Sequence, residues 1–304
     1  MNQAECVQVT ESNRWSRFWD ESVARSGHTG YAEALLYHYD QPVRLRTVRG
    51  VVRRHFPAGL TGCDVLDIGC GTGDFIQLSL GEGAKHVVGV DVSPQVLAKA
   101  AARVQGNPRV VLSQGTVLEQ VSRGQDQYDL ITSITVLQHH VEDTQLIAAL
   151  TTLRTALKPS GKIIVLELAP PHEVEDRQYS RGVLYLVERP PKAWRSAFTA
   201  AGLRVVDEPV MPQFGIVCLR GLNRLVGLIY KPRQTGDDTE EGNPATPEPA
   251  MGQPLTLKRR VLRAGLALAR RFTLWLCYPL DHWLRFPLPP IRFRTYRIFV
   301  LEKK

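Results

Sequence analysis

The sequence predicts an α/β protein built on a mainly parallel β-sheet. Between about residues 64 and 170, short apolar segments alternate with segments of helical period, which is the pattern of successive βαβ units. One apolar segment runs directly into a loop with glycines at alternate positions, Gly69, Gly71 and Gly73. Such a loop between a strand and a helix lets a ligand approach the backbone closely, as nucleotide-like ligands do in parallel sheets.

The expected elements follow from local signals along the chain. A helix is expected over 93–104, with Ser93 as its N-cap and Pro94 at its first position. Apolar segments of strand length predict strands over 64–70, 86–92, 109–117, 128–135, 162–169 and 203–210, and the alternating segment 295–304 predicts a last strand. Further helices are expected over 144–158, stopped by Pro159 and Gly161, and over 191–202.

Residues 212–290 separate the last two expected strands and form an expected insertion. Its segment 231–254 has five prolines, three glycines and no aromatic residue, so we expect a disordered loop. Segment 255–276 forms an amphipathic helix on a helical wheel. Its arginines lie on one face (Arg259, Arg260, Arg263, Arg270, Arg271) and its apolar residues on the other (Val261, Leu262, Leu268, Ala269, Phe272, Trp275, Leu276). We favour packing of the apolar face on the sheet; the alternative is binding to an anionic membrane.

Charge and cysteine content narrow the class of protein. Residues 251–304 contain 12 of the 38 Lys and Arg but only 2 of the 30 Asp and Glu, so the first 250 residues carry 26 basic and 28 acidic side chains. This balance argues against a body that binds nucleic acid, but not against a tail that contacts an anionic surface. The five cysteines form no C-x-x-C pair, which favours a reducing compartment, and the polar N-terminus shows no signal peptide.

The glycine loop excludes two common ligand sites. Its spacing is G-x-G-x-G followed by Asp74, whereas the dinucleotide fingerprint requires G-x-G-x-x-G. The Gly-Lys-Ser/Thr ending of a phosphate-binding P-loop is also absent. The loop therefore predicts a nucleoside site that does not clamp a pyrophosphate.

Four linked stretches resemble the class I S-adenosylmethionine-dependent methyltransferases: LDIGCGTGDF (66–75), GVDVS (89–93), SQGTVLEQV (113–121) and YDLITSITVLQHH (128–140). The resemblance implies a Rossmann-like seven-stranded sheet, mostly parallel, with an antiparallel last strand. It also implies a helical N-terminal lid over 1–60, a core over 61–211 and 291–304, and the helical insertion before the last strand. The lid segment is rich in aromatic residues.

The resemblance also implies which residues bind the cofactor, S-adenosyl-L-methionine. Asp67 would meet its ammonium group, the loop backbone its methionine part, and Asp91 the two ribose hydroxyls, which suit two carboxylate oxygens. Thr116 takes the place of the acid that usually contacts the adenine amino group. The segment QPVRLRTV (41–48) is similar to a segment of quinone-type O-methyltransferases, which places an arginine for the cofactor carboxylate at Arg44, with Arg46 as second choice. The full expected set is Arg44, Asp67, Gly69, Gly71, Asp91, Val92, Thr116, Val117 and Ser133, and no metal is expected.

The acceptor is less well defined by sequence. His139 and His140 are the candidate catalytic bases, and Glu167 and His172 are weaker candidates on the same rim. Asp143 is expected to cap the helix that follows. The Asn/Asp-Pro-Pro-Tyr/Phe motif of enzymes that methylate base amines is absent.

The expected function is methyl transfer to O or N of a small-molecule, specialised metabolite, in the cytoplasm. The alternative is a lipid or quinone-like acceptor methylated at the membrane surface by a peripherally bound enzyme. A scaffold protein that keeps the fold without turnover is the third hypothesis, and the intact glycine loop and acids disfavour it.

Overall fold

The expected sheet is present in a computed structural model of the chain. Within the described residues, seven strands form one sheet in the order β3-β2-β1-β4-β5-β9-β8. The first five are mutually parallel, and β9 is antiparallel to both β5 and β8, which confirms the predicted Rossmann-like fold. Their bounds are β1 Asp64–Ile68, β2 His86–Asp91, β3 Val110–Gln114, β4 Tyr128–Ile134, β5 Leu157–Leu168, β8 Leu203–Asp207 and β9 Tyr296–Lys303.

The structure describes residues 3–29, 34–121, 127–170, 178–181, 184–229, 257–281 and 296–304. They belong to two compact units, residues 1–212 with 287–304 and residues 213–286. Expectations that fall on segment 231–254 and on His172 lie outside the described residues.

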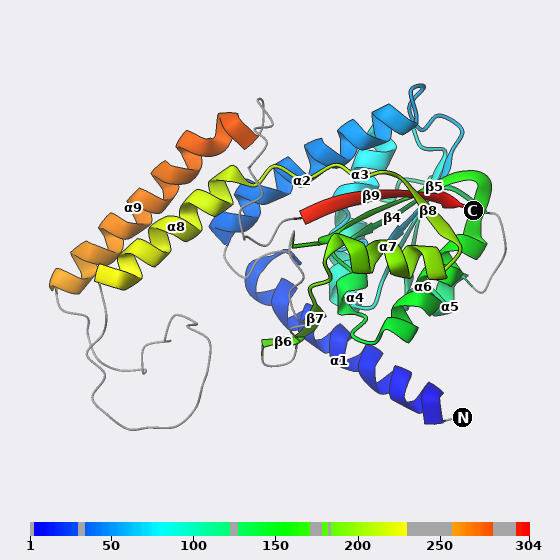
Figure 1. Cartoon of the computed structure of the whole chain (residues 1–304), viewed down its shortest axis with the longest axis horizontal. Helices are drawn as coiled ribbons and strands as arrows, with labels where there is room; N and C mark the ends of the chain where they lie inside the picture. Colours follow the sequence, from blue (N-terminus) through cyan, green and yellow to red (C-terminus); the bar gives the residue numbers. More distant parts are fainter. Residues whose placement is uncertain are drawn as a thin grey trace. The chain divides into compact units, whose positions relative to one another are not determined.

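Helices cover both faces of the sheet in the first unit (Figure 1). On one face, α2 (Ala34–His55), α3 (Asp74–Gly81) and α4 (Pro94–Val104) share a hydrophobic cluster with Val65 and Leu130. On the other face, α5 (Val117–Val121), α6 (Asp143–Ala156) and α7 (Pro191–Ala200) share a second cluster with Leu66 and Ile131. Because side chains alternate along a strand, neighbouring residues of β1 and β4 supply both cores. The strands are therefore buried on both sides, as parallel sheets require.

Most helix and strand signals predicted the observed elements, with one correction and two omissions. The Ser93 hydroxyl accepts a hydrogen bond from the Val96 amide at 3.1 Å, and Pro94 is the first residue of α4. The helix expected over 144–158 ends at Ala156, because Leu157 already begins β5, so Pro159 lies within a strand. The sequence reading also missed α5 and the hairpin of β6 (Gln178–Arg181) and β7 (Leu184–Val187).

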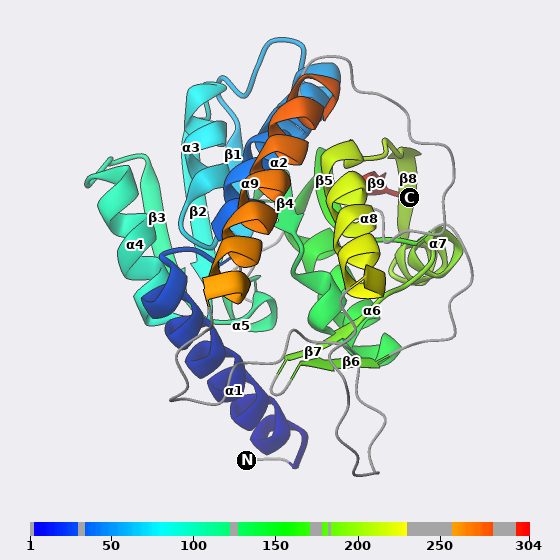
Figure 2. The ribbon, with the colours of Figure 1, turned by 90° about the vertical axis from the view of Figure 1, so that its left-hand side faces the viewer.

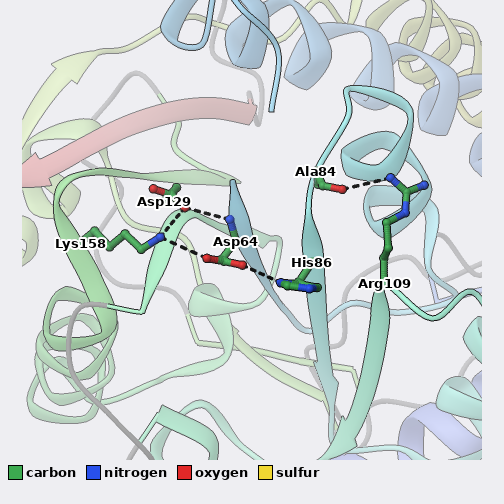
Figure 3. Close-up of polar contacts among 6 residues, drawn as sticks. All are labelled: Asp64, Ala84, His86, Arg109, Asp129 and Lys158. Carbon is green, nitrogen blue, oxygen red and sulfur yellow. Dashed lines mark hydrogen bonds and ion pairs between the residues drawn. The ribbon is translucent and has the colours of Figure 1, made fainter. Parts of the chain in front are cut away.

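Polar contacts join the starts of four strands at the amino edge of the sheet (Figure 3). The Lys158 ammonium group donates to Asp129 at 2.7 Å and to Asp64 at 3.2 Å. Asp129 also accepts from the Asp64 amide at 2.8 Å, and the His86 ring lies 2.9 Å from the Asp64 carboxylate. These contacts fix the register of β1, β2, β4 and β5 at the edge opposite to the glycine loop.

The second unit contains two contacting helices, α8 (Phe214–Ile229) and α9 (Leu257–Pro279) (Figure 1). The sequence predicted α9 but not α8. The buried Asp281 carboxylate accepts hydrogen bonds from the first two amides of α8, Phe214 at 2.7 Å and Gly215 at 2.8 Å. Of the helices in the described ranges, none has a long enough uncharged apolar stretch to cross a bilayer.

Candidate functional site

The site is centred on the glycine loop between β1 and α3. Gly69, Gly71 and Gly73 have φ angles of 63°, 55° and 85°, which disfavour side chains with a Cβ atom. A Cβ on Gly69 would lie 2.2 Å from Cγ2 of Val136, in the segment that follows β4. A Cβ on Gly71 would lie 2.8 Å from the Thr29 hydroxyl. The glycines therefore let two other segments close on the loop.

Asp67 is a buried carboxylate immediately before the loop. It is 1% exposed, and its Oδ1 accepts a hydrogen bond from the Thr132 hydroxyl at 2.6 Å. Its Oδ2 is buried and has no hydrogen-bond partner among the described residues. Burial, opposed by the Thr132 hydrogen bond and reinforced by the charge of Asp91, raises the pKa of Asp67 to about 7. A cation that reached this oxygen would stabilise the ionised form.

Asp91, at the end of β2, connects its strand to the glycine loop. Its Oδ2 accepts from the Gly71 amide at 3.0 Å, and its Oδ1 accepts from the Ser93 amide at 3.0 Å. Burial raises the pKa of Asp91, and these backbone hydrogen bonds oppose that shift. The two amides fix the orientation of the carboxylate, whose remaining lone pairs suit the paired hydroxyls of a ribose.

The other expected cofactor residues differ in their surroundings. The Thr116 hydroxyl accepts from the Glu119 amide at 3.4 Å while the Glu119 carboxylate accepts from the Thr116 amide at 2.7 Å, which is a capping box at the start of α5. The backbone carbonyl of Val92 accepts a hydrogen bond from the side-chain amide of Gln114 at 3.2 Å. Val117 is buried, and the buried Ser133 hydroxyl has no hydrogen-bond partner within the described ranges.

Glu167, at the end of β5, holds the segment that follows β4. Its Oε1 accepts from the amides of Val136 at 2.9 Å and Leu137 at 2.7 Å. Glu167 is fully buried, and this burial raises its pKa to about 8 against the opposing effect of the backbone hydrogen bonds. Thr135 has a φ of 60°, a strained value for a threonine. Glu167 is thus a positioning residue rather than an exposed base.

His139 and His140 follow this held segment, in and after the 3-10 helix η1 (Leu137–His139). The His139 ring centroid lies 4.6 Å from that of Trp15 and 6.1 Å from that of Trp19, both in α1 (Gln3–Ser26). For His140, burial, reinforced by His139 and Arg189, lowers the pKa to about 4. Because so weak a base accepts a proton poorly at neutral pH, His139 is the better candidate.

The expectation that Asp143 caps α6 is wrong. The N-cap residue is Glu142, and Asp143 lies in the first turn with its carboxylate accepting from Arg189 at 2.8 Å. The same Arg189 nitrogen donates to the carbonyls of His140 and Val141, each at 3.0 Å. Arg189 and Glu167 therefore hold the two ends of the His139 segment. Arg189 follows β7, far away in sequence, and no local signal identified it.

Arg44 has partners within the protein itself. It is 8% exposed, its Nε lies 2.5 Å from the Asp40 carboxylate, and its guanidinium carbon lies 4.5 Å from the Tyr296 ring centroid. The i,i+4 spacing of Asp40 and Arg44 is the local sequence signal that could have predicted this ion pair. A cofactor carboxylate would therefore have to share Arg44 with Asp40.

The N-terminal segment contacts the site at several points. From α1, the Asp20 carboxylate accepts from the Ser93 hydroxyl and from the Gln95 amide at the start of α4, which lies beside α1 (Figure 2). From α2, Tyr37 donates to the Asp74 carboxylate at 3.1 Å. These lid contacts were missed by sequence reasoning, because they join residues that share no local pattern.

The arrangement fits S-adenosylmethionine. A buried, unsatisfied carboxylate oxygen on Asp67 suits an ammonium group, an oriented Asp91 suits a ribose, and the glycine loop leaves its backbone open to close approach. Among the described residues, no group of three or more His, Cys, Asp or Glu side chains is placed to hold a metal ion.

Known proteins resemble this chain in sequence or in fold. Residues 65–161 match the family described as a methyltransferase domain. The chain is 30% identical over 171 residues to the ubiquinone biosynthesis O-methyltransferase of Aeromonas salmonicida, covering 54% of this chain and 64% of that protein. It is 37% identical over 103 residues to the tRNA U34 carboxymethyltransferase of Shewanella piezotolerans, covering 33% of this chain and 30% of that protein. The alignments thus span less than two thirds of these relatives.

Two solved structures share the fold. An S-adenosylmethionine-dependent methyltransferase from Leishmania major matches with a TM-score of 0.53 and 17% identity, over 66% of this chain and 76% of that one. The cyclase SpnF matches with a TM-score of 0.52 and 18% identity, over 85% of this chain and 81% of that one. Because one of these proteins is named as a cyclase, the fold alone does not define the reaction. Residues 65–161 thus match a methyltransferase domain, and the four motifs and the strand order around them resemble those of the class I S-adenosylmethionine-dependent methyltransferases.

Proposed function

We propose that this protein transfers a methyl group from S-adenosylmethionine to O or N of a small-molecule acceptor. The observation that carries the proposal is the buried Asp67 carboxylate beside the glycine loop, with one oxygen unsatisfied among the described residues and its pKa raised to about 7. A ligand ammonium group would satisfy this oxygen and favour ionised Asp67. Methyl transfer would account for a site that offers partners for a nucleoside with an amino-acid tail but has no P-loop.

Each cofactor group has a candidate partner in this chain. Asp67 would hold the ammonium group, Asp91 the ribose hydroxyls and the glycine-loop amides the remaining methionine atoms. Val92, Thr116, Val117 and Ser133 would line the adenosine part, and Arg44 would be shared between the carboxylate and Asp40. When bound, the cofactor supplies a methyl group already activated on a sulfonium sulfur.

The chain itself would contribute alignment of the acceptor and removal of its proton. His139 is our candidate base, since it lies beside Trp15 of the lid and the pKa of the neighbouring His140 is lowered to about 4. Glu167 and Arg189 would hold its segment in place, and the lid would exclude water. Alignment of a nucleophile with an activated methyl supplies much of the rate in such displacements.

Calorimetric titration with S-adenosylhomocysteine tests the cofactor assignment. We expect micromolar binding to the wild type, loss of at least tenfold in affinity for Asp91→Ala, and no binding of NAD. Glu302→Ala is the matched control, because Glu302 pairs with Lys162 and Arg204 towards the amino edge of the sheet. Absence of binding to the wild type would refute the proposal, as would equal effects of the two substitutions.

A lipid or quinone-like acceptor is the second candidate. It is favoured by the similarity to a ubiquinone biosynthesis O-methyltransferase and by the Arg44 segment. Methylation assays with a long-chain alkylated phenol in micelles and a short water-soluble analogue distinguish the two candidates. A preference for the alkylated phenol by tenfold or more in kcat/KM supports the lipid acceptor, and equal rates contradict it.

An RNA acceptor, suggested by the tRNA-modifying relative, is disfavoured by charge. The first 250 residues carry two more acidic than basic side chains, whereas binding to phosphates relies on a basic surface.

A further inference from the structure

Helix α9 carries an exposed apolar face. Leu268, Phe272, Trp275 and Leu276 are 67%, 61%, 70% and 59% exposed. Their spacing of four, three and one residues places them on one side of the helix. The rings of Phe272 and Trp275 stack with centroids 5.9 Å apart. This face therefore consists of large side chains that cost free energy in water.

The opposite side of α9 packs against α8. Cys277 is buried and hydrogen-bonded to Cys218 of α8, and Asp281 caps the start of α8. Leu274 is also buried. Because Leu274 and Cys277 on this side of α9 are buried, the exposed face is not needed for the contact between α8 and α9. The expectation that the apolar face packs on the sheet concerns a contact between the two units and stays a prediction.

The exposure is concentrated on this one helix. Among the described residues, eight large hydrophobic side chains are exposed, and the five on α9 include every Leu, Phe, Trp and Tyr of the set. The other three are valines on or beside edge strands, Val111, Val206 and Val210. Isolated exposed valines are ordinary, whereas a contiguous stripe with two aromatic rings marks a contact surface.

The charge of α9 indicates what contacts this face. Residues 257–279 contain six basic residues and no Asp or Glu, and α8 contains two arginines and no acid. Arg271 is exposed and lies between Leu268 and Phe272 in sequence, at the border of the apolar face. An apolar face bordered by a cation complements an anionic lipid surface, with the rings in the acyl boundary and Arg271 at the phosphates.

The size of the face argues against a protein partner. At about 200 Å² per large side chain, the four exposed residues present roughly 500 Å². A standard protein interface needs ~800 Å² from each partner. A bilayer requires no matching shape, so a narrow stripe on one helix is sufficient.

We propose that α9 docks on anionic membranes through the face formed by Leu268, Phe272, Trp275 and Leu276. The helix lies parallel to the surface, with Arg271 at the lipid phosphates and α8 on the side away from the bilayer. This inference concerns location and stands independently of the cofactor assignment, although it would bring a lipid-like acceptor to the enzyme.

Vesicle co-sedimentation of the full chain tests the proposal. We expect binding to phosphatidylcholine vesicles that contain phosphatidylglycerol and at least tenfold weaker binding to phosphatidylcholine alone. Phe272→Ser/Trp275→Ser should weaken binding to the anionic vesicles at least tenfold. Val111→Ser/Val206→Ser is the matched control, since it removes two exposed apolar side chains elsewhere and should bind like the wild type.

Further measurements distinguish loss of folding, loss of membrane binding and loss of cofactor binding. Circular dichroism checks that each variant keeps its helix content. Arg271→Glu gives a second test, a charge reversal at an exposed position that leaves the apolar face intact and should weaken only binding to anionic vesicles. Wild-type protein that does not bind anionic vesicles would overturn the proposal, as would an oligomer that dissociates in Phe272→Ser/Trp275→Ser without lipid. Titration with S-adenosylhomocysteine without vesicles should give equal affinities in all these variants, so failure of the cofactor assignment appears separately.

Discussion

The substitution Gly69→Ala tests the geometry of the glycine loop directly. Two costs are expected, because Gly69 has a φ of 63° and its added Cβ would lie 2.2 Å from Cγ2 of Val136. The left-handed backbone costs about 1–2 kcal/mol with a Cβ present. Forcing apart the loop and the segment after β4 adds about 1–3 kcal/mol. The total expected loss in free energy of unfolding is therefore about 2–5 kcal/mol.

Gly106 provides a matched control for this substitution. Its φ is 68°, but a Cβ there would meet nothing within 4 Å, so Gly106→Ala should cost only about 1–2 kcal/mol. Val136→Ala in the Gly69→Ala background removes the overlapping methyl groups and should recover part of the loss. Urea unfolding followed by circular dichroism measures the free energy of unfolding of five proteins: the wild type, Gly69→Ala, Gly106→Ala, Val136→Ala and Gly69→Ala/Val136→Ala.

The reasoning is refuted if Gly69→Ala is no more destabilising than Gly106→Ala. It would also be contradicted by additive effects of Gly69→Ala and Val136→Ala, because the overlap requires the two sites to be coupled.

Three other predictions concern buried acids and the lid. The pKa of Asp67 is raised from its ordinary value of 3.8 to about 7 on folding, so the folded state binds more protons between these values and stability falls as pH rises from about 4 to 7. Unfolding free energies at pH 4.5 and pH 8 should therefore differ less in Asp67→Asn than in the wild type, and an unchanged difference would contradict the burial of Asp67. Glu167→Ala should lose about 1–3 kcal/mol of stability for each amide left without an acceptor, whereas Glu167→Gln keeps an acceptor oxygen and should lose less, as thermal melts can show. Asp20→Ala removes the acceptor for Ser93 and Gln95 and should speed amide exchange in α1 but not in α6, whereas unchanged exchange would show that these contacts do not hold the lid.

Sequence reasoning succeeded where the determinants are local. The glycine loop, Ser93 and Pro94 are each specified by a few adjacent residues, so the strand–loop–helix units were placed within a few residues of their observed bounds. The antiparallel position of the last strand came from the family resemblance, and the structure confirms it.

The errors have physical causes of two kinds. Pro159 was taken as a helix stop, but neighbouring strand pairing with Tyr128 already recruits Leu157 into β5. Asp143 was taken as a cap because its type and position fit, although Arg189, brought in from beyond β7, engages its carboxylate. Contacts across such long sequence separations leave no periodic signal. The same limit applies to the lid, where Trp15 meets His139 only after folding.

The position of β9 between β5 and β8 has a consequence for biosynthesis. During translation, β8 emerges well before β9, its one neighbour among the described strands, since residues 208–295 separate the two. Strand β8 must therefore wait, with its edge exposed to other chains, until residues 296–303 have left the ribosome. Loop closure entropy grows only by about 0.6 kcal/mol for each doubling of loop length, so the intervening segment is a tolerant place for added sequence. Helices such as α8 and α9 can thus be added or exchanged at this position during evolution without a change in the strands that carry the glycine loop.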